Sequence, residues 1–124
     1  MQIGKLIRAK NVLISFIKER MSPKLSYKLM KFISKIEMEE KFFGEKVRDI
    51  INTYGERDEN NELVSIDNKI KIRESAEDDC NKAFAELDAV EVEAPNITFT
   101  LEELSEIKLS VEDMVILEDF IVEE

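Results

Sequence analysis

The stretch that decides the fold runs from Ser22 to Gly55 and reads SPKLSYKLMKFISKIEMEEKFFGEKVRDIINTYG. It opens with Ser22-Pro23, an N-cap residue followed by proline at the first helical position, and it closes on Gly55, a common helix stop. Apolar side chains recur in it at the spacing of one buried helix face, and they are Leu25, Leu29, Phe32, Ile36, Phe43, Val47, Ile50 and Tyr54. The sequence therefore predicts one long helix over 23–54.

A helix of this length is longer than the domain that carries it. At ~1.5 Å per residue it measures about 48 Å, whereas a compact chain of 124 residues has a diameter of roughly 35 Å. We therefore expect the helix to project from the domain, to bend, or to continue its apolar face against a second copy of the chain. Gly44 lies inside it, at a cost of about 1 kcal/mol relative to alanine, and is the predicted hinge.

Shorter elements are predicted on both sides of this helix. Residues 3–20 carry an apolar helical stripe, and the link to the long helix is so short that the two should form an antiparallel hairpin. Downstream, apolar residues alternating with polar ones predict two short strands, 63–66 and 69–72, joined by a turn at Asp67-Asn68.

The last third of the sequence mixes short helices with short strands. Capping boxes, in which Ser or Thr precedes an acidic residue by three positions, predict helix starts at Ser75, Thr100 and Ser110. The first of these helices covers about 76–88, and the last carries apolar residues as far as Ile121. Between them, a third strand is predicted where Val90 and Val92 alternate with glutamates, and 97–99 extends the sheet.

The most unusual feature of the sequence is the distribution of its charge. The net charge is −10, yet residues 1–35 carry +8, residues 74–124 carry −15, and the residues between them carry −3. We therefore expect one domain, a mostly helical α+β fold, in which a basic helical hairpin over 1–54 joins an acidic α+β part over 55–124.

Several classes of chemistry are disfavoured by the composition. There is no histidine, which removes His-based triads, His metal sites and His acid–base catalysis. The three glycines are scattered, so no phosphate-binding loop is present. The lone Cys80 lies on the apolar face of its helix and is interpreted as core packing, and Glu37, Glu39 and Glu40 as a solvated helix face. We expect no enzyme activity, no cofactor and no metal.

The location of the protein is inferred from what the sequence lacks. No apolar run approaches the ~18 residues of a membrane span, and the N-terminal residues intersperse Lys and Arg among apolar positions, unlike a signal peptide. One cysteine excludes an internal disulfide. These features predict a cytoplasmic protein with no membrane partner.

The order of features resembles a known family. A basic first helix and a long Lys/Glu helix are followed by Tyr54-Gly-Glu-Arg-Asp-Glu-Asn-Asn61, then by Val90-Glu-Val92 and Leu109-Ser-Val-Glu-Asp113. This order is similar to that of small proteins of unknown function encoded by tailed phages and prophages of low-GC Gram-positive bacteria. The sequence departs from that pattern at Met21-Ser22-Pro23, where the family has a glycine. The resemblance implies a phage origin, an α+β fold and expression in the cytoplasm of a bacterial host, and it transfers no catalytic residue.

The acidic block suggests the first hypothesis of function. A negative surface is suited to a basic groove on another protein, such as one that normally holds DNA or RNA, and charge complementarity would make that association fast and salt-sensitive. We therefore expect a non-enzymatic binding protein of the inhibitor or anti-defence type that docks on a basic surface of a host protein. The candidate residues are Glu91, Glu93, Glu102, Glu103 and Glu106.

Two alternatives remain open at this point. The long helix predicts self-association, as in a virion or tail assembly protein. A row of basic side chains at helical spacing, with one more on the first helix, is a candidate nucleic-acid surface, and it consists of Lys24, Lys28, Lys31, Lys35 and Arg8. Because the protein is acidic overall and no aromatic residues interleave with this row to stack on bases, nucleic acid is the weaker alternative.

Overall fold

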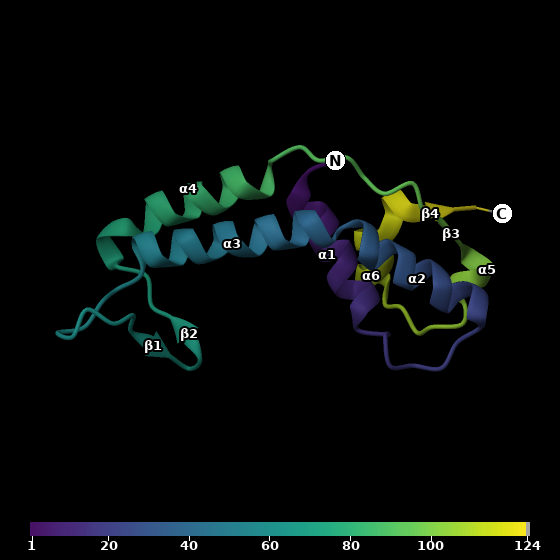
Figure 1. The fold of residues 1–124 in the computed structure, drawn as a ribbon, viewed down its shortest axis with the longest axis horizontal. Helices are drawn as coiled ribbons and strands as arrows, with labels where there is room; N and C mark the ends of the chain where they lie inside the picture. Colours follow the sequence, from purple (N-terminus) through teal and green to yellow (C-terminus); the bar gives the residue numbers. More distant parts are fainter. Residues whose placement is uncertain (124) are drawn as a thin grey trace.

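The chain folds into a head and a projecting arm (Figure 1). A computed structural model describes residues 1–123. The head contains α1 (Ile3–Ile14), α2 (Pro23–Lys35), β3 (Phe99–Thr100), α5 (Leu101–Leu104), α6 (Val111–Leu117), the 3₁₀ turn η2 (Glu118–Phe120) and β4 (Ile121–Val122). The arm contains α3 (Glu37–Tyr54), β1 (Ser65–Ile66), β2 (Lys69–Ile70), the 3₁₀ turn η1 (Glu74–Ala76) and α4 (Glu77–Asp88). The mostly helical α+β class expected from the sequence is confirmed.

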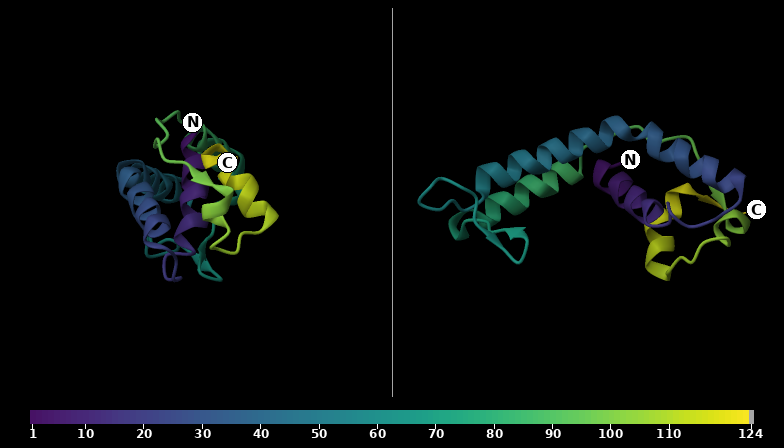
Figure 2. Two further views of the ribbon diagram at one scale, coloured as in Figure 1. Left: turned by 90° about the vertical axis from the view of Figure 1, so that its right-hand side faces the viewer. Right: turned by 60° about the horizontal axis from the view of Figure 1, so that its bottom comes forward.

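The long helix predicted over 23–54 is two helices that meet at Ile36. Ile36 has φ −104° and ψ 11°, and its N–H bonds back to Ser34 instead of continuing the α-helical pattern. Its side chain is buried in the head, so α2 stays against the head while α3 leaves it (Figure 2). Two of the three outcomes expected for an over-long helix therefore occur, because it bends and then projects. The head and the arm therefore join at this residue.

The hinge predicted at Gly44 is wrong. Gly44 lies inside α3, which continues without interruption to Tyr54. Three acidic side chains in the first turn of α3, Glu37, Glu39 and Glu40, instead mark where a new helix begins, because carboxylates are favoured near the positive end of the helix dipole.

Gly44 supplies the first testable prediction. A methyl group added at Gly44 would meet no atom within 4 Å, whereas one added at Gly55 would lie 2.6 Å from the Ile51 carbonyl oxygen and 2.6 Å from Leu63 Cδ2. We expect Gly44→Ala to raise the free energy of unfolding by about 1 kcal/mol, and Gly55→Ala to lower it. Denaturant unfolding of the two variants measures both changes, and a destabilising Gly44→Ala would contradict this geometry.

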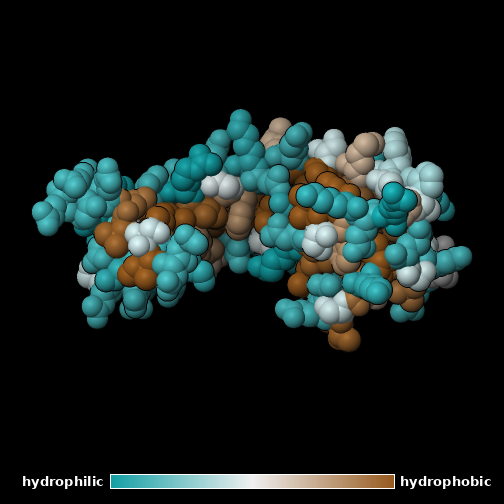
Figure 3. Space-filling view, turned by 90° about the horizontal axis from the view of Figure 1, so that it is seen from below, coloured by the Kyte–Doolittle hydropathy of each residue, from teal (hydrophilic) through white to brown (hydrophobic). Residues whose placement is uncertain are grey.

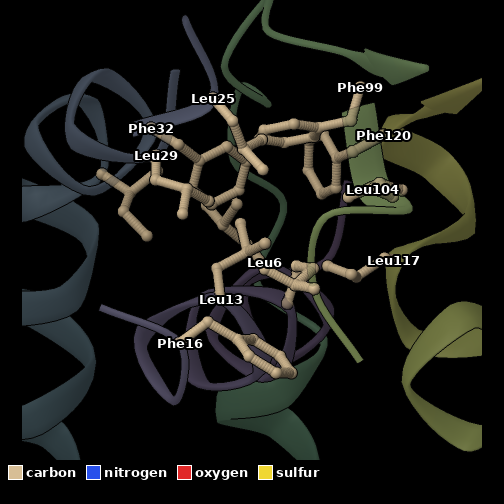
Figure 4. Packing of buried hydrophobic residues seen from close by; sticks show 13 residues of the cluster. Leu6, Leu13, Phe16, Leu25, Leu29, Phe32, Phe99, Leu104, Leu117 and Phe120 are labelled. Carbon is tan, nitrogen blue, oxygen red and sulfur yellow. The ribbon is translucent and has the colours of Figure 1, made fainter. Parts of the chain in front are cut away.

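The core of the head is built from both ends of the sequence. α1 and the turn after it contribute Leu6, Leu13 and Phe16, and α2 contributes one face that includes Phe32. The C-terminal segments close the cluster from the other side with Phe99, Leu104, Ile107, Leu117 and Phe120 (Figure 4). The Phe32 ring meets Phe120 edge-on, with centroids 4.9 Å apart, and Phe99 at 6.4 Å. The head is therefore a single core that needs residues from each end of the chain.

The arm is a helical hairpin with little core of its own. α3 and α4 run antiparallel, side by side (Figures 1 and 2), and β1 and β2 form the predicted hairpin at the far end, with Asp67 and Asn68 at positive φ as a tight turn requires. α4 buries Cys80 and Leu87, as expected for Cys80, but no residue of α3 is fully buried. The apolar face of α3 is therefore only half covered.

Other predicted elements are shorter than expected or differ in type. The first helix ends at Ile14, not at residue 20. Ser75 lies in the η1 turn and caps nothing, whereas the boxes at Thr100 and Ser110 both form. The last helix ends at Leu117, and Ile121 belongs to β4. β4 pairs in parallel with β3, in a second sheet that a local reading did not predict.

Candidate functional site

The basic and acidic blocks meet along a seam of partly exposed ion pairs. Lys5 pairs with Asp119 at 2.7 Å, Arg8 with Asp88 at 3.3 Å, and the Met1 ammonium with Glu91 at 2.9 Å. The hydrogen bond and charge of Asp119 raise the pKa of Lys5. Part of the opposite charge of the two blocks is thus neutralised by ion pairs that join the first residues of the chain to its C-terminal third.

Three of the five candidate acidic residues are engaged inside the molecule: Glu91 by the Met1 ammonium, and Glu103 and Glu106 by groups of α2 and its N-cap. Glu103 Oε1 accepts hydrogen bonds from Lys28 Nζ at 2.8 Å and from the Thr100 N–H at 3.0 Å, and these bonds lower its pKa. Glu106 accepts from the Ser22 hydroxyl at 2.6 Å and the Ser22 N–H at 2.7 Å, which lowers its pKa in the same way. Both carboxylates tie the start of α2 to α5, so they are structural groups and poor candidates for contact with a partner.

The basic row is also broken by an internal contact. Lys28 is half-buried, and its Nζ atom donates to the Glu103 carboxylate and to the Thr98 carbonyl oxygen. The same Nζ atom lies 5.7 Å from the centroid of the Phe99 ring. Arg8 is paired with Asp88. Lys24, Lys31 and Lys35 remain exposed on α2. The structure therefore leaves three lysines of the row facing solvent, which shortens the track that a phosphate backbone would follow.

Most of the acidic block nevertheless faces solvent. Among residues 74–123, four carboxylates form ion pairs, those of Asp88, Glu91, Glu103 and Asp119. Twelve others form none, and every one of these except Asp113 is exposed. The seam therefore neutralises only a minority of the acidic groups, and the outer surface of this part of the chain stays strongly negative.

Glu91 and Glu93 lie at the neck, where the arm joins the head. The segment after α4 runs past residue 1 on its way to β3 (Figure 1). Ile3 N–H donates to the Val90 carbonyl at 2.8 Å, and Val92 N–H donates to the Met1 carbonyl at 2.8 Å. This antiparallel bridge, with Gln2 opposite Glu91, is what remains of the strand predicted at 90–93. We call residues 90–93 the neck strand.

An apolar groove of about 290 Å³ lies beside the neck strand. Val90 and Val92 form one wall, α3 supplies Met38 and Phe42, and Ile3 and Glu39 complete the lining. Met38 is 79% exposed and Phe42 is 38% exposed, which is unusual for large apolar side chains that lie next to one another. We call this feature the neck groove.

Glu39 places an unsatisfied charge beside the neck groove. Its Oε2 atom is buried and has no hydrogen-bond partner in the described part of the chain, although Glu40 next to it pairs with Lys10 of α1. A buried carboxylate oxygen without a partner is costly, so a hydrogen-bond donor that enters the groove would relieve this cost once the Glu39 side chain turns toward it. The sequence placed Glu39 on a solvated face, and no local pattern distinguished it from Glu37.

Other features of the described residues are less suited to binding a ligand or to catalysis. A hollow of about 740 Å³ at the end of the arm is wide open and lined by charges of both signs, Arg57 and Arg73 with Glu56 and Glu74. Burial raises the pKa of the Cys80 thiol, which disfavours the reactive thiolate. Within residues 1–123, no cluster of three or more acidic or cysteine side chains is placed to hold a metal ion.

The comparisons with known proteins are negative. No protein-family model, no curated protein and no solved structure matches the chain. In the described residues, none of the helices combines the length and the apolar character needed to cross a bilayer.

Proposed function

We propose that this chain is a non-enzymatic, phage-encoded protein-binding module that docks by its acidic surface on a basic surface of a host protein. The proposed target is a basic groove of the kind that otherwise holds nucleic acid. Binding of this chain in that groove would inhibit the host protein. This protein acts in the host cytoplasm.

The observation that supports this proposal is the acidic surface that remains after folding. Ion pairing at the seam uses four of the carboxylates of residues 74–123, and eleven others are exposed without an ionic partner. A surface of one sign accelerates encounter with an oppositely charged partner by a factor of roughly 10 to 10³, an effect that falls steeply with salt. It also excludes partners of like charge.

Affinity capture with charge-reversed variants tests this proposal. The tagged chain is used to capture proteins from a lysate of a low-GC Gram-positive bacterium, in parallel with the Glu93→Lys/Glu102→Lys variant. Both side chains are exposed and make no internal contact in the described residues, so the fold should survive. We expect a basic protein to be retained by the original chain, released at ~0.5 M salt, and depleted at least tenfold on the variant.

The matched control reverses two charges elsewhere. Glu59→Lys/Glu62→Lys changes the net charge equally, but in the loop at the end of the arm, outside the acidic block, where both residues are exposed. We expect this control to retain the same protein. Equal retention by the Glu93→Lys/Glu102→Lys variant, or retention that persists at high salt, would contradict docking through the acidic surface of the head and neck.

Self-association through the arm is a second candidate that one observation favours. Apolar side chains of α3, including Phe43, Val47 and Ile51, are only half-buried, and an apolar band follows the arm toward the head (Figure 3). Two such arms packed together would make a four-helix bundle, the arrangement expected of an assembly protein.

The dependence of binding on salt concentration distinguishes self-association through the arm from docking on a basic partner. Association of two chains of charge −10 through apolar arms is opposed by repulsion, so it should strengthen as salt screens that repulsion. Sedimentation velocity at low and at ~0.5 M salt measures this directly. A dimer that grows with salt supports the arm interface, whereas a monomer under both conditions eliminates it.

A further inference from the structure

We infer that the neck strand and neck groove bind an extended segment of a partner protein in which apolar and basic residues alternate, by adding it as a strand to the open edge of residues 91–93. This inference rests on the proposed function, because it names the place and the chemistry by which the acidic surface would recognise its partner.

The open edge follows from the hydrogen bonds of the neck strand. The Val90 carbonyl accepts from the Ile3 N–H, and both backbone groups of Val92 bond to Met1, so these groups face the first residues of the chain. Because backbone groups alternate in direction along a strand, those of Glu91 and Glu93 point the other way. Neither residue makes a backbone hydrogen bond in the described part of the chain, and both are exposed. An exposed edge of this kind is a template for another strand.

The side chains specify what kind of strand fits. Val90 and Val92 line the groove, so Glu91 and Glu93 lie on the opposite face of the neck strand. A strand added beside them would present alternate residues to the two faces. Those over the groove would meet Met38, Phe42 and the valines, so they should be apolar. Those beside Glu93 and Glu91 should be Lys or Arg, as favourable cross-strand pairs, because the Glu91 side chain stays 73% exposed although it accepts from the Met1 ammonium.

Glu39 adds a third requirement on the groove side. Its unpartnered Oε2 lies at the margin of an otherwise apolar lining. A Lys or Arg at one end of the bound segment, with its aliphatic stem along the groove, would give this oxygen a hydrogen bond. The expected segment is therefore short, extended and basic, with apolar residues at every second position.

The same features exclude a second copy of this chain as the occupant. If two neck strands paired edge to edge, Glu91 and Glu93 of each copy would lie beside those of the other, and like charges across a strand pair are destabilising. The edge of this chain also carries no basic residue between 89 and 98. The occupant is thus a different protein.

A displayed library of random nine-residue peptides, selected on the full chain, tests this inference. We expect enrichment of peptides that alternate apolar and basic residues, and hydrogen exchange at the Glu91 and Glu93 amides should slow when such a peptide binds. Enriched basic peptides that leave these two amides unprotected would overturn the edge but leave acid-guided binding intact. Failure to enrich basic residues would overturn the proposed function as well.

A proline substitution isolates the backbone contribution. Glu93→Pro removes an outward N–H that makes no internal hydrogen bond. Val92 pairs with Met1 next to the Gln2–Glu91 bridge, a strand-like setting that suits a residue before proline. We expect it to weaken a selected peptide at least tenfold, whereas Glu93→Ala, which removes the charge but keeps the N–H, should weaken it about threefold. Equal losses in the two variants would show that the backbone edge is not used. An unchanged thermal midpoint confirms that each variant folds.

Discussion

Replacing Phe32 with alanine should lower the free energy of unfolding by about 4 kcal/mol. Phe32 is fully buried and its ring lies between Phe120 at 4.9 Å and Phe99 at 6.4 Å, centroid to centroid. The substitution removes both aromatic contacts and leaves a cavity where α2 meets the C-terminal segments. Because small domains are stable by only about 5–15 kcal/mol, chemical denaturation should show a large loss of the folded population.

Two further substitutions, Phe32→Leu and Phe42→Ala, distinguish the loss of core volume at Phe32 from the loss of any phenylalanine. Phe32→Leu retains most of the volume and should cost roughly 1–2 kcal/mol, so it stays folded if the alanine variant does not. Phe42→Ala, which truncates a phenylalanine on the exposed side of α3, should cost less than about 1 kcal/mol. Similar losses at Phe32 and Phe42 would show that the head does not hold the main core.

Replacing Glu103 with alanine should cost about 2 kcal/mol, which corresponds to a thermal midpoint lower by roughly 8 °C. The Glu103 side chain is 11% exposed, and its Oε1 atom bonds both Lys28 and the Thr100 N–H that starts α5. Its removal leaves a half-buried lysine without its carboxylate. The neighbouring Glu102 is exposed, so Glu102→Ala should change stability by less than about 0.5 kcal/mol. Equal effects would contradict a structural role for Glu103.

The same carboxylate sets a pH dependence. Its hydrogen bonds with Lys28 and Thr100 hold the pKa of Glu103 below its ordinary value of 4.5. Its contribution to stability is therefore complete above pH 4.5 and is lost as the pH falls below that value through the lowered pKa of the folded state. Glu106 follows the same direction. Thermal midpoints measured from pH 6 down to about pH 3 should fall more steeply for the original chain than for Glu103→Gln.

Local patterns predicted the parts of the fold that local chemistry decides. The turn at Asp67-Asn68 and the capping boxes at Thr100 and Ser110 depend on neighbouring residues, and all three are present. The break at Ile36 depends on where the head ends, which no periodicity shows, although three acids in the following turn were a readable signal of a new helix start. The pairing of β3 with β4 joins segments distant in sequence, so nothing local predicted it.

The candidate site, too, was only partly predictable from local sequence patterns. The sequence identified an acidic block, but the separation of structural from exposed carboxylates required the contacts that Glu103 and Glu106 make with α2 and Ser22. The neck groove brings together residues from α1, α3 and the segment after α4. Met38 and Phe42 fall outside the apolar face of the long helix, and this misfit was the one sequence signal that pointed to them.

The most direct test of acid-guided docking at the neck is hydrogen exchange of the full chain with and without a captured basic partner. We expect the partner to slow exchange at Glu91 and Glu93 and to leave the exposed face of α2 unchanged. Slowed exchange confined to α3 and α4, or to the lysines of α2, would contradict docking at the neck and would favour the arm or the basic row instead.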